Sequence, residues 1–178
     1  SYSPEAIELL ARKKNLRVIE AERPTEPELS VRTIAGGLLV QTSDPGGFDR
    51  DETTVVTERQ PEPSEWVDLE LAWKLAARVT SNCIVLVKDT MAVGIGAGQQ
   101  NRRDAGRIAA EKAAGRAVGG ACASDAFFPF RDGLDAAAEA GATCVVQPGG
   151  SVRDDEVIAA ANEANMAMVF TGVRHFRH

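Results

Sequence analysis

The sequence predicts a layered α/β domain built on a mixed or largely parallel sheet. Through the second half of the chain, short apolar runs alternate with Ala-rich segments of helical character, the pattern of helices packed on a sheet. One run, residues 83–88 (CIVLVK), is apolar almost throughout, as expected for a strand covered on both faces. The 178 residues, 44% apolar and 26% charged, suffice for one domain with a substantial core.

The first half of the chain predicts one helix followed by strands and loops. Ser3 is placed to cap the helix, and Pro4 falls in its first turn, where proline is tolerated. Two glycines, Gly36 and Gly37, interrupt a later strand-like run. The elements, in order, are a helix over 3–15, a strand over 16–22, a polar loop over 22–30, an interrupted strand over 31–44, a loop over 45–52 and a short β-branched strand over 53–58.

The second half begins with a long helix over residues 64–79. Its apolar side chains form a single stripe of Trp66, Leu69, Trp73 and Ala76. The remaining elements are strands over 83–88, 91–98, 142–148 and 166–170, and helices over 101–115, 132–141 and 152–165.

Composition excludes several classes of function. A formal charge of −6, with 20 Lys and Arg spread among 26 Asp and Glu, leaves no basic stripe for nucleic acid. No apolar run is long enough to cross a membrane, and acids interrupt the apolar stripe of the first residues, so we expect no leader peptide. The three cysteines, Cys83, Cys122 and Cys144, lack any metal-ligand spacing, which predicts reduced thiols in the cytoplasm and no zinc.

Histidine is scarce, and this limits the chemistry. The chain has two histidines, both in its last four residues. A reaction that needs a central histidine would take it from another chain or another segment.

The glycine-rich run at residues 94–103 (GIGAGQQNRR) allows two interpretations. Its spacing is not that of a dinucleotide-binding or triphosphate loop. Glycines before a helix let backbone amides approach an anion, which would make this a binding loop. A polar turn capped by Asn101 explains the same residues without a ligand, and the sequence does not separate the two.

Three further polar segments are candidates with simpler structural explanations. Asn82, in VTSN before a strand, can end a helix, although ligands gather at strand ends. Ser151, with Asp154 at the capping-box position, can cap a helix. The tail GVRHFRH is either frayed or pinned at the sheet edge, where Arg174 would be placed to bind a phosphate or carboxylate.

Residues 124–130 (SDAFFPF) contain half of the six phenylalanines in the chain. Pro129 removes a ladder donor, and Asp125 and Asp132 flank the aromatic residues, so a central buried strand is disfavoured. The segment is therefore predicted to be a loop.

The ordered series of segments resembles a known family. GGLLVQ, SN before an apolar strand, GIGAGQQNR, SDAFFPFRDGLD, QPGGSVRD and GVRHFRH are together similar to the C-terminal part of the bifunctional purine-biosynthesis family, which joins AICAR formyltransferase to IMP cyclohydrolase. The resemblance spans nearly the whole chain. It implies an α/β/α cytidine-deaminase-like subdomain without zinc, the second of two in the formyltransferase, over residues 1–178.

The resemblance also implies a reaction. The family transfers a formyl group from 10-formyltetrahydrofolate to the 5-amino group of AICAR in purine biosynthesis. It implies a cytoplasmic homodimer whose active sites form across the dimer interface. The family's Lys-His pair lies in the first subdomain and has no counterpart here, so we expect this chain to be a piece of a longer protein and inactive alone.

Site residues follow from the same resemblance. It places Asn82, which also helps catalysis, with Phe127 and Arg174 at AICAR. The resemblance further implies that Phe127 faces the flat imidazole, while Phe128 and Phe130 anchor their loop in the core. The folate side comprises Arg102, Arg103, Pro129, Asp132 and Ser151, although Arg103 stands where an apolar residue is common. Val79, Ser81 and Asp125 resemble a structural potassium site.

A second hypothesis keeps the fold without the reaction. The chain would then be a non-catalytic binding or dimerisation module. The combined retention of Asn82, Arg102, Phe127, Asp132 and Arg174 speaks against it, because a scaffold has no physical need for them together.

Overall fold

The chain separates into two units in the computed structural model, residues 1–45 and residues 46–178. The structure describes residues 2–22, 29–44 and 46–177. Most of the predicted polar loop over 22–30 lies outside the described residues. Among the described residues, no helix has the length and apolar character needed to cross a membrane.

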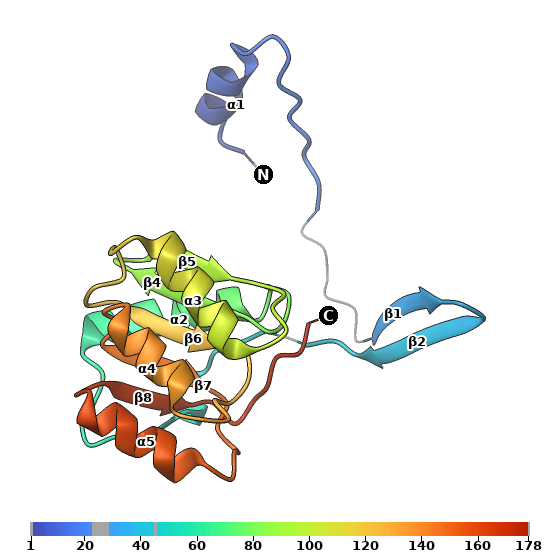
Figure 1. The fold of residues 1–178 in the computed structure, drawn as a ribbon. Coiled ribbons are helices and arrows are strands. Elements are labelled where there is room, and N and C mark those ends of the chain that lie inside the picture. Colours follow the sequence, from blue (N-terminus) through green and yellow to red (C-terminus); the bar gives the residue numbers. More distant parts are fainter. Residues whose placement is uncertain (1, 23–28, 45, 178) are drawn as a thin grey trace. The chain divides into compact units, whose positions relative to one another are not determined.

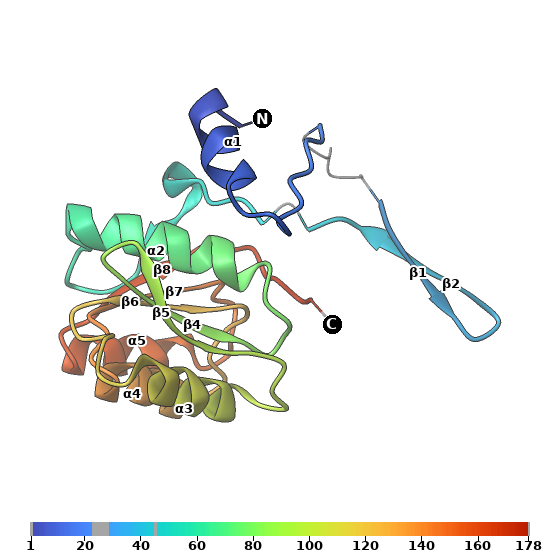
Figure 2. The same ribbon diagram turned by 90° about the horizontal axis from the view of Figure 1, so that it is seen from above.

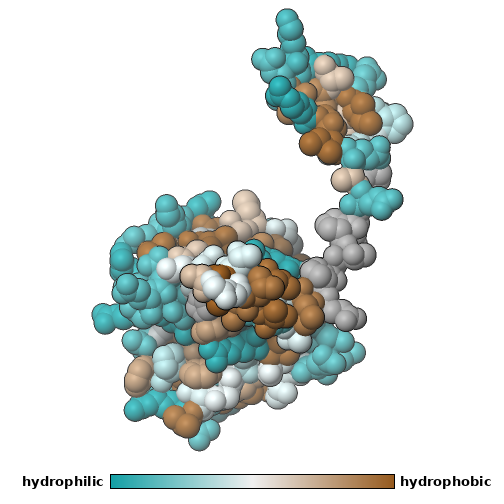
Figure 3. Space-filling model, turned by 90° about the vertical axis from the view of Figure 1, so that its right-hand side faces the viewer, coloured by the Kyte–Doolittle hydropathy of each residue, from teal (hydrophilic) through white to brown (hydrophobic). Residues whose placement is uncertain are grey.

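The first unit contains helix α1 (Pro4–Ala11) and a hairpin of β1 (Leu29–Ile34) and β2 (Gly37–Thr42). The Ser3 hydroxyl accepts a hydrogen bond from the Ala6 amide at 3.2 Å, which confirms the predicted cap. Apolar side chains of α1 face solvent within this unit, and Figure 3 shows brown atoms gathered on it.

Two predictions for the first unit are wrong. Residues 16–22 form no strand: their β-branched side chains favour extended backbone, but the segment pairs with no other strand that the structure describes. The run over 31–44 is part of a hairpin and not one interrupted strand. Gly36 has φ of +81° in the turn, a conformation that glycine adopts without strain, so the two glycines reverse the chain.

The second unit is a six-stranded mixed sheet between two helical layers. Strand order is β3-β8-β7-β6-β4-β5, with β6-β7 and β7-β8 parallel and the other pairs antiparallel. Helix α2 covers one face, and α3, α4 and α5 cover the other (Figures 1 and 2). This confirms the predicted α/β layers. The elements are η1 (Arg50–Glu52), β3 (Thr54–Val55), α2 (Pro63–Ala76), β4 (Ile84–Lys88), β5 (Met91–Gly96), α3 (Arg102–Ala113), β6 (Ala121–Ser124), α4 (Asp132–Glu139), β7 (Cys144–Gln147), α5 (Asp154–Glu163) and β8 (Ala167–Phe170).

Strand β6 lies in the middle of the sheet and was not predicted. Its sequence, ACAS, has none of the β-branched or aromatic residues that favour strands. All four residues are buried between β4 and β7. Small side chains suit this place because helices cover both faces, so tertiary packing sets the strand where local propensity does not.

The core divides along the two faces of the sheet. The larger cluster lies under α3, α4 and α5, and the smaller one lies under α2. Leu69, Trp73 and Ala76 of the predicted stripe are buried, and the Trp73 indole donates to the Gly47 carbonyl at 3.1 Å. Trp66 is only partly buried, beneath the Arg50 guanidinium at 4.1 Å, because it lies at the edge of the helix–sheet contact.

Gly94 and Gly96 allow α3 to pack directly on β5. A Cβ atom at Gly94 would lie 2.1 Å from the Ala109 carbonyl oxygen, and one at Gly96 would lie 1.9 Å from the Ala105 oxygen. Both contacts are with helix backbone, which cannot move aside as a side chain can. These two glycines therefore serve helix–strand packing, which neither interpretation of the GIGAG run anticipated.

We expect Gly96→Ala to lower the free energy of unfolding by about 3 kcal/mol, since the methyl group must push α3 off the sheet. Urea denaturation measures the change. The matched control is Gly47→Ala, where a Cβ meets nothing within 4 Å. Equal stability of Gly96→Ala and the control would contradict this packing role.

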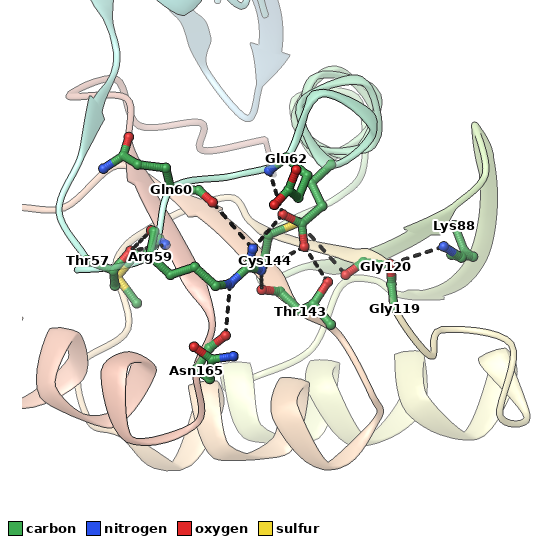
Figure 4. Close-up of polar contacts among 12 residues, drawn as sticks. Thr57, Arg59, Gln60, Glu62, Lys88, Gly119, Gly120, Thr143, Cys144 and Asn165 are labelled. Atoms are coloured by element: carbon green, nitrogen blue, oxygen red, sulfur yellow. Dashed lines mark hydrogen bonds and ion pairs between the residues drawn. The ribbon is translucent and has the colours of Figure 1, made fainter.

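The Arg59 side chain links helix α2 to the loops before β7 and β8. This contact lies at the edge of the sheet opposite the loops that follow β6 and β7. Its guanidinium donates to both Glu65 carboxylate oxygens at 2.9 and 2.7 Å, to the Thr143 carbonyl at 2.6 Å and, through Nε, to the Asn165 carbonyl at 2.9 Å. Figure 4 shows Arg59 reaching from its own loop to Thr143 and Asn165. This network ties the start of α2 to the segments before β7 and β8.

Glu65 is the acidic centre of that network. Burial raises its pKa, but hydrogen bonds from Arg59, Thr143 and the Glu62 amide outweigh burial, so the pKa lies below its usual value. A carboxyl group with a lowered folded-state pKa stabilises the fold above its unfolded pKa. That stabilisation is lost as the pH falls through the folded-state value.

We therefore expect Glu65→Gln to cost about 2 kcal/mol at pH 7, with the difference from wild type shrinking below about pH 4. Urea denaturation at several pH values measures both. Glu70→Gln removes an exposed ion pair with Lys74 and is the control, expected within about 0.5 kcal/mol of wild type. A Glu65→Gln penalty that does not change with pH would refute the charged role.

Candidate functional site

Five segments with predicted site residues emerge at one edge of the sheet. Ile84, the first residue of β4, pairs with both Gly96 and Ser124, the last residues of β5 and β6. Gln147 and Phe170, the last residues of β7 and β8, pair with each other at the same edge. The carboxyl ends of parallel strands are where α/β folds bind ligands, so the topology gathers these loops at a favourable place.

The Asp125 carboxylate is the centre of this edge. It is fully buried, the Ser81 hydroxyl donates to its Oδ2, and the Cys83 amide donates to its Oδ1 at 3.2 Å. An Arg102 guanidinium nitrogen lies 3.2 Å from the same Oδ1. The backbone carbonyl of Asp125 accepts from the His175 amide at 3.0 Å. One residue therefore joins the loops after α2, β5, β6 and β8.

Asn82 is fixed beside this centre. Its amide and carbonyl both bond to the backbone of Gln99, at 3.3 and 3.2 Å, and its side-chain NH₂ donates to the Gln99 carbonyl at 2.9 Å. The Ser81–Asn82 peptide is cis. Helix α2 ends at Ala76, so the interpretation of Asn82 as a helix terminator is wrong. The Asn82 amide oxygen has no hydrogen-bond partner among the described residues.

An open pocket of about 530 Å³ lies between the start of α3 and the start of α4. Four of the five residues assigned to the folate side line it, namely Arg102, Arg103, Pro129 and Asp132. The complete lining is Asn101, Arg102, Arg103, Asp104, Phe128, Pro129, Phe130, Asp132 and Gly133.

The two arginines of the pocket, Arg102 and Arg103, differ in their burial and in their contacts. The Nε atom of Arg102 is buried and has no hydrogen-bond partner within the described part of the chain, although Nη2 contacts Asp125. Arg103 is exposed and forms no ion pair with any residue that the structure describes. Asn101 caps α3 by accepting from the Asp104 amide at 2.8 Å, so the predicted capped turn is confirmed.

The phenylalanines of SDAFFPF take three different positions. Phe128 is fully buried, as predicted, and its amide donates to Oε1 of the buried Gln147 side chain at 2.9 Å. Phe127 is partly buried. Phe130 is 49% exposed at the pocket, so its predicted core position is wrong: Phe128 already fills the space beneath the loop, against Gly133. Gln147 fixes this loop through its side chain. The sequence did not predict this role, because a Gln as the last residue of a strand is not unusual.

Ser151 does not cap a helix, and it is not among the pocket's lining residues. Helix α5 begins at Asp154, and the Ser151 hydroxyl accepts from the Arg153 amide at 3.2 Å instead. The Asp154 carboxylate reaches back to the Gly150 amide at 2.7 Å. The two side chains therefore order the loop before the helix, which begins two residues later than predicted.

The C-terminal tail is held at the sheet edge by hydrogen bonds. Of the two possibilities that the sequence left open, a frayed tail and a pinned one, the structure shows the second. The His175 amide donates a hydrogen bond to the Asp125 carbonyl at 3.0 Å. The Arg177 carbonyl accepts a hydrogen bond from the Ser81 amide at 2.7 Å. The His175 ring lies 4.4 Å from Trp73. Arg174 is exposed beside this anchor, with its guanidinium 4.1 Å from the Phe176 ring. The tail thus brings Arg174 to the edge where Asn82 and Phe127 lie.

Cysteine chemistry is disfavoured at this edge. Burial, with the nearby Asp125 charge, raises the pKa of Cys83 to about 12, so this thiol is not a nucleophile. Burial likewise raises the pKa of Cys122 to about 12. Within the described part of the chain, no three His, Cys, Asp or Glu side chains lie close enough together to hold a metal ion.

Comparison with known proteins now adds to the geometry. The family model described as AICARFT/IMPCHase bienzyme matches residues 1–112. The chain belongs to this family. Relatives named bifunctional purine biosynthesis protein PurH are 54% identical in Roseobacter denitrificans, over 98% of this chain, and 48% identical in Bacillus subtilis, over all of it.

The match covers only part of these relatives. The chain spans about 35% of the length of the Roseobacter denitrificans and Bacillus subtilis proteins. A solved structure, form 2 of RibD from Acinetobacter baumannii, aligns over 58% of this chain and 33% of its own. Its TM-score of 0.40 and identity of 19% carry no argument about the fold.

We expect Asp125→Ala to destabilise the chain by about 3 kcal/mol, because it leaves Arg102 and the donors at Ser81 and Cys83 without their buried acceptor. Urea denaturation measures the loss. Asp155→Ala, which removes an exposed acid of α5, is the control and should lie within about 0.5 kcal/mol of wild type. An Asp125→Ala chain as stable as the control would show that the buried contacts are not needed.

Proposed function

We propose that this chain forms the AICAR- and folate-binding part of an AICAR formyltransferase. The supporting observation is that residues assigned to the two ligands from separate segments emerge at one edge of the sheet, four of the five folate-side residues around one pocket. The Asp125 carboxylate links Arg102, which lines the pocket, to Ser81, which precedes Asn82. A non-catalytic module would not require this link between the folate side and the AICAR side.

The proposed reaction defines what the site must do. The 5-amino nitrogen of AICAR attacks the formyl carbon, and the bond from that carbon to N10 of the folate then breaks. The amine loses a proton to a base, and N10 of the departing tetrahydrofolate gains one. The amine is a weak nucleophile because its lone pair is delocalised into the ring, so orientation and proton removal both matter.

Asn82 is suited to orient the amine. Its NH₂ group is held by the Gln99 carbonyl, which leaves the amide oxygen to accept a hydrogen bond from the substrate amine. Phe127 would pack on the flat imidazole, and Arg174 would bind the phosphate through charge-assisted hydrogen bonds.

The folate side would use the pocket. Asp132 accepts hydrogen bonds from the amino group of the pterin, and Arg102, with its unpartnered Nε, is a donor close to the reacting centre. Arg103 and Pro129 contribute to the pocket wall. Ser151 would contact the folate from the loop before α5.

A potassium ion is the proposed structural cofactor. The backbone carbonyls at Val79 and Ser81 and the Asp125 carboxylate would offer oxygens, the ligand type that hard cations prefer. Arg102 already compensates part of the Asp125 charge, so the ion would hold the loops together and take no part in formyl transfer.

The general base is not among the residues at this edge. The side chain of His175 lies against Trp73, and the thiol of Cys83 stays protonated at neutral pH. We propose that the Lys-His pair comes from another part of the protein, in a cytoplasmic homodimer, and that this chain alone does not turn over.

A crossed binding experiment tests the assignment of sides. Arg174→Ala should weaken AICAR binding about tenfold and leave folic acid binding unchanged, whereas Asp132→Ala should do the reverse. Isothermal titration of the 178-residue chain measures each. Equal effects of both variants on both ligands would refute the two-sided site, and formyl transfer by this chain alone would refute the external base.

A further inference from the structure

One basic side chain at the rim of the open pocket belongs to none of the predicted sites. Arg153 lies in the loop between β7 and α5, and its Cζ is 4.7 Å from the ring centroid of Phe130. Phe130 lines the pocket and is 49% exposed. The guanidinium therefore lies against an exposed residue of the pocket wall, although Arg153 is not itself a lining residue and the two residues come from different loops.

The contacts that hold Arg153 are weak enough for a ligand to replace. Its Nη1 donates to Glu156 Oε2 at 3.0 Å, and the two side chains are 50% and 40% exposed. An ion pair this exposed contributes little, because water competes for both partners. A ligand carboxylate that binds the guanidinium with two parallel hydrogen bonds would form a stronger pair.

Charges inside the pocket favour the rim as the place for an anionic group. Asp104 and Asp132 both line the pocket, Arg102 is already paired with the buried Asp125, and Arg103, the other lining cation, is exposed to solvent. An anion placed deep in the pocket would meet these carboxylates, which repel it. A neutral, hydrogen-bonding ring inside and a negative group at the mouth suit this distribution.

We propose that Arg153 binds the glutamate carboxylates of the folate co-substrate at the mouth of the pocket. The assignment rests on the proposed function, because it requires a folate in this pocket. A folate carries a flat, polar pterin at one end and glutamate at the other. The pterin enters toward Asp132, and the glutamate stays outside, where Arg153 lies over Phe130.

The test compares folic acid with pteroic acid, which has the same rings without the glutamate, by isothermal titration of the 178-residue chain. Arg153→Ala should weaken folic acid binding about tenfold and leave pteroic acid binding unchanged. Glu156→Gln frees Arg153 and should tighten folic acid binding about twofold. Arg107→Ala removes a similar exposed pair with Glu111, outside the pocket, and should change neither.

The outcomes separate this assignment from the function on which it rests. Equal losses for both compounds in Arg153→Ala, or no loss for either, would overturn the assignment while leaving folate binding intact. A wild-type chain that binds neither compound would overturn the proposed function and the assignment with it. Thermal melts followed by circular dichroism show that each variant remains folded.

Discussion

The buried carboxylate of Asp125 is the constraint on which the functional edge depends. A fully buried charge is tolerated only when donors surround it, and here three donors come from two separate segments: the Ser81 hydroxyl and the Cys83 amide before β4, and the Arg102 guanidinium at the start of α3. The backbone of the same residue holds His175. The need to satisfy one charge thus fixes Asn82, the first turn of α3 and the C-terminal tail relative to one another. Both ligand sides of the proposed site inherit their geometry from this requirement.

The opposite edge of the sheet is organised in a similar way by Arg59. Its guanidinium and the Glu65 carboxylate satisfy each other, and the remaining donors reach backbone carbonyls in two further connections. Between these two polar centres the sheet is apolar on both faces. The result is a rigid layer whose ends are held by charges and whose middle is held by packing, which suits a site that must keep several loops in place.

Parts of the fold were accessible from local sequence, and the failures have identifiable causes. The helices with clear stripes or caps, such as α1 and α2, were predicted because their signals lie within one segment. Strand β6 was missed because Ala, Cys and Ser carry no strand preference, and residues 16–22 were misjudged because β-branched residues form a strand only when a partner exists. The resemblance implied a core position for Phe130, but only the packed structure shows that Phe128 already fills the space beneath the loop.

The sequence by itself determined the layered α/β class, the loop character of SDAFFPF and the family to which the chain belongs, because these are properties of short segments and of their order. The tertiary structure decided which segments meet. The pairing of Ile84 with Gly96 and Ser124, and of Gln147 with Phe170, brings the loops to one edge. Only there does Arg102 find Asp125, and Arg153 find Phe130, because both contacts join residues that are distant along the chain and close only once the sheet has formed.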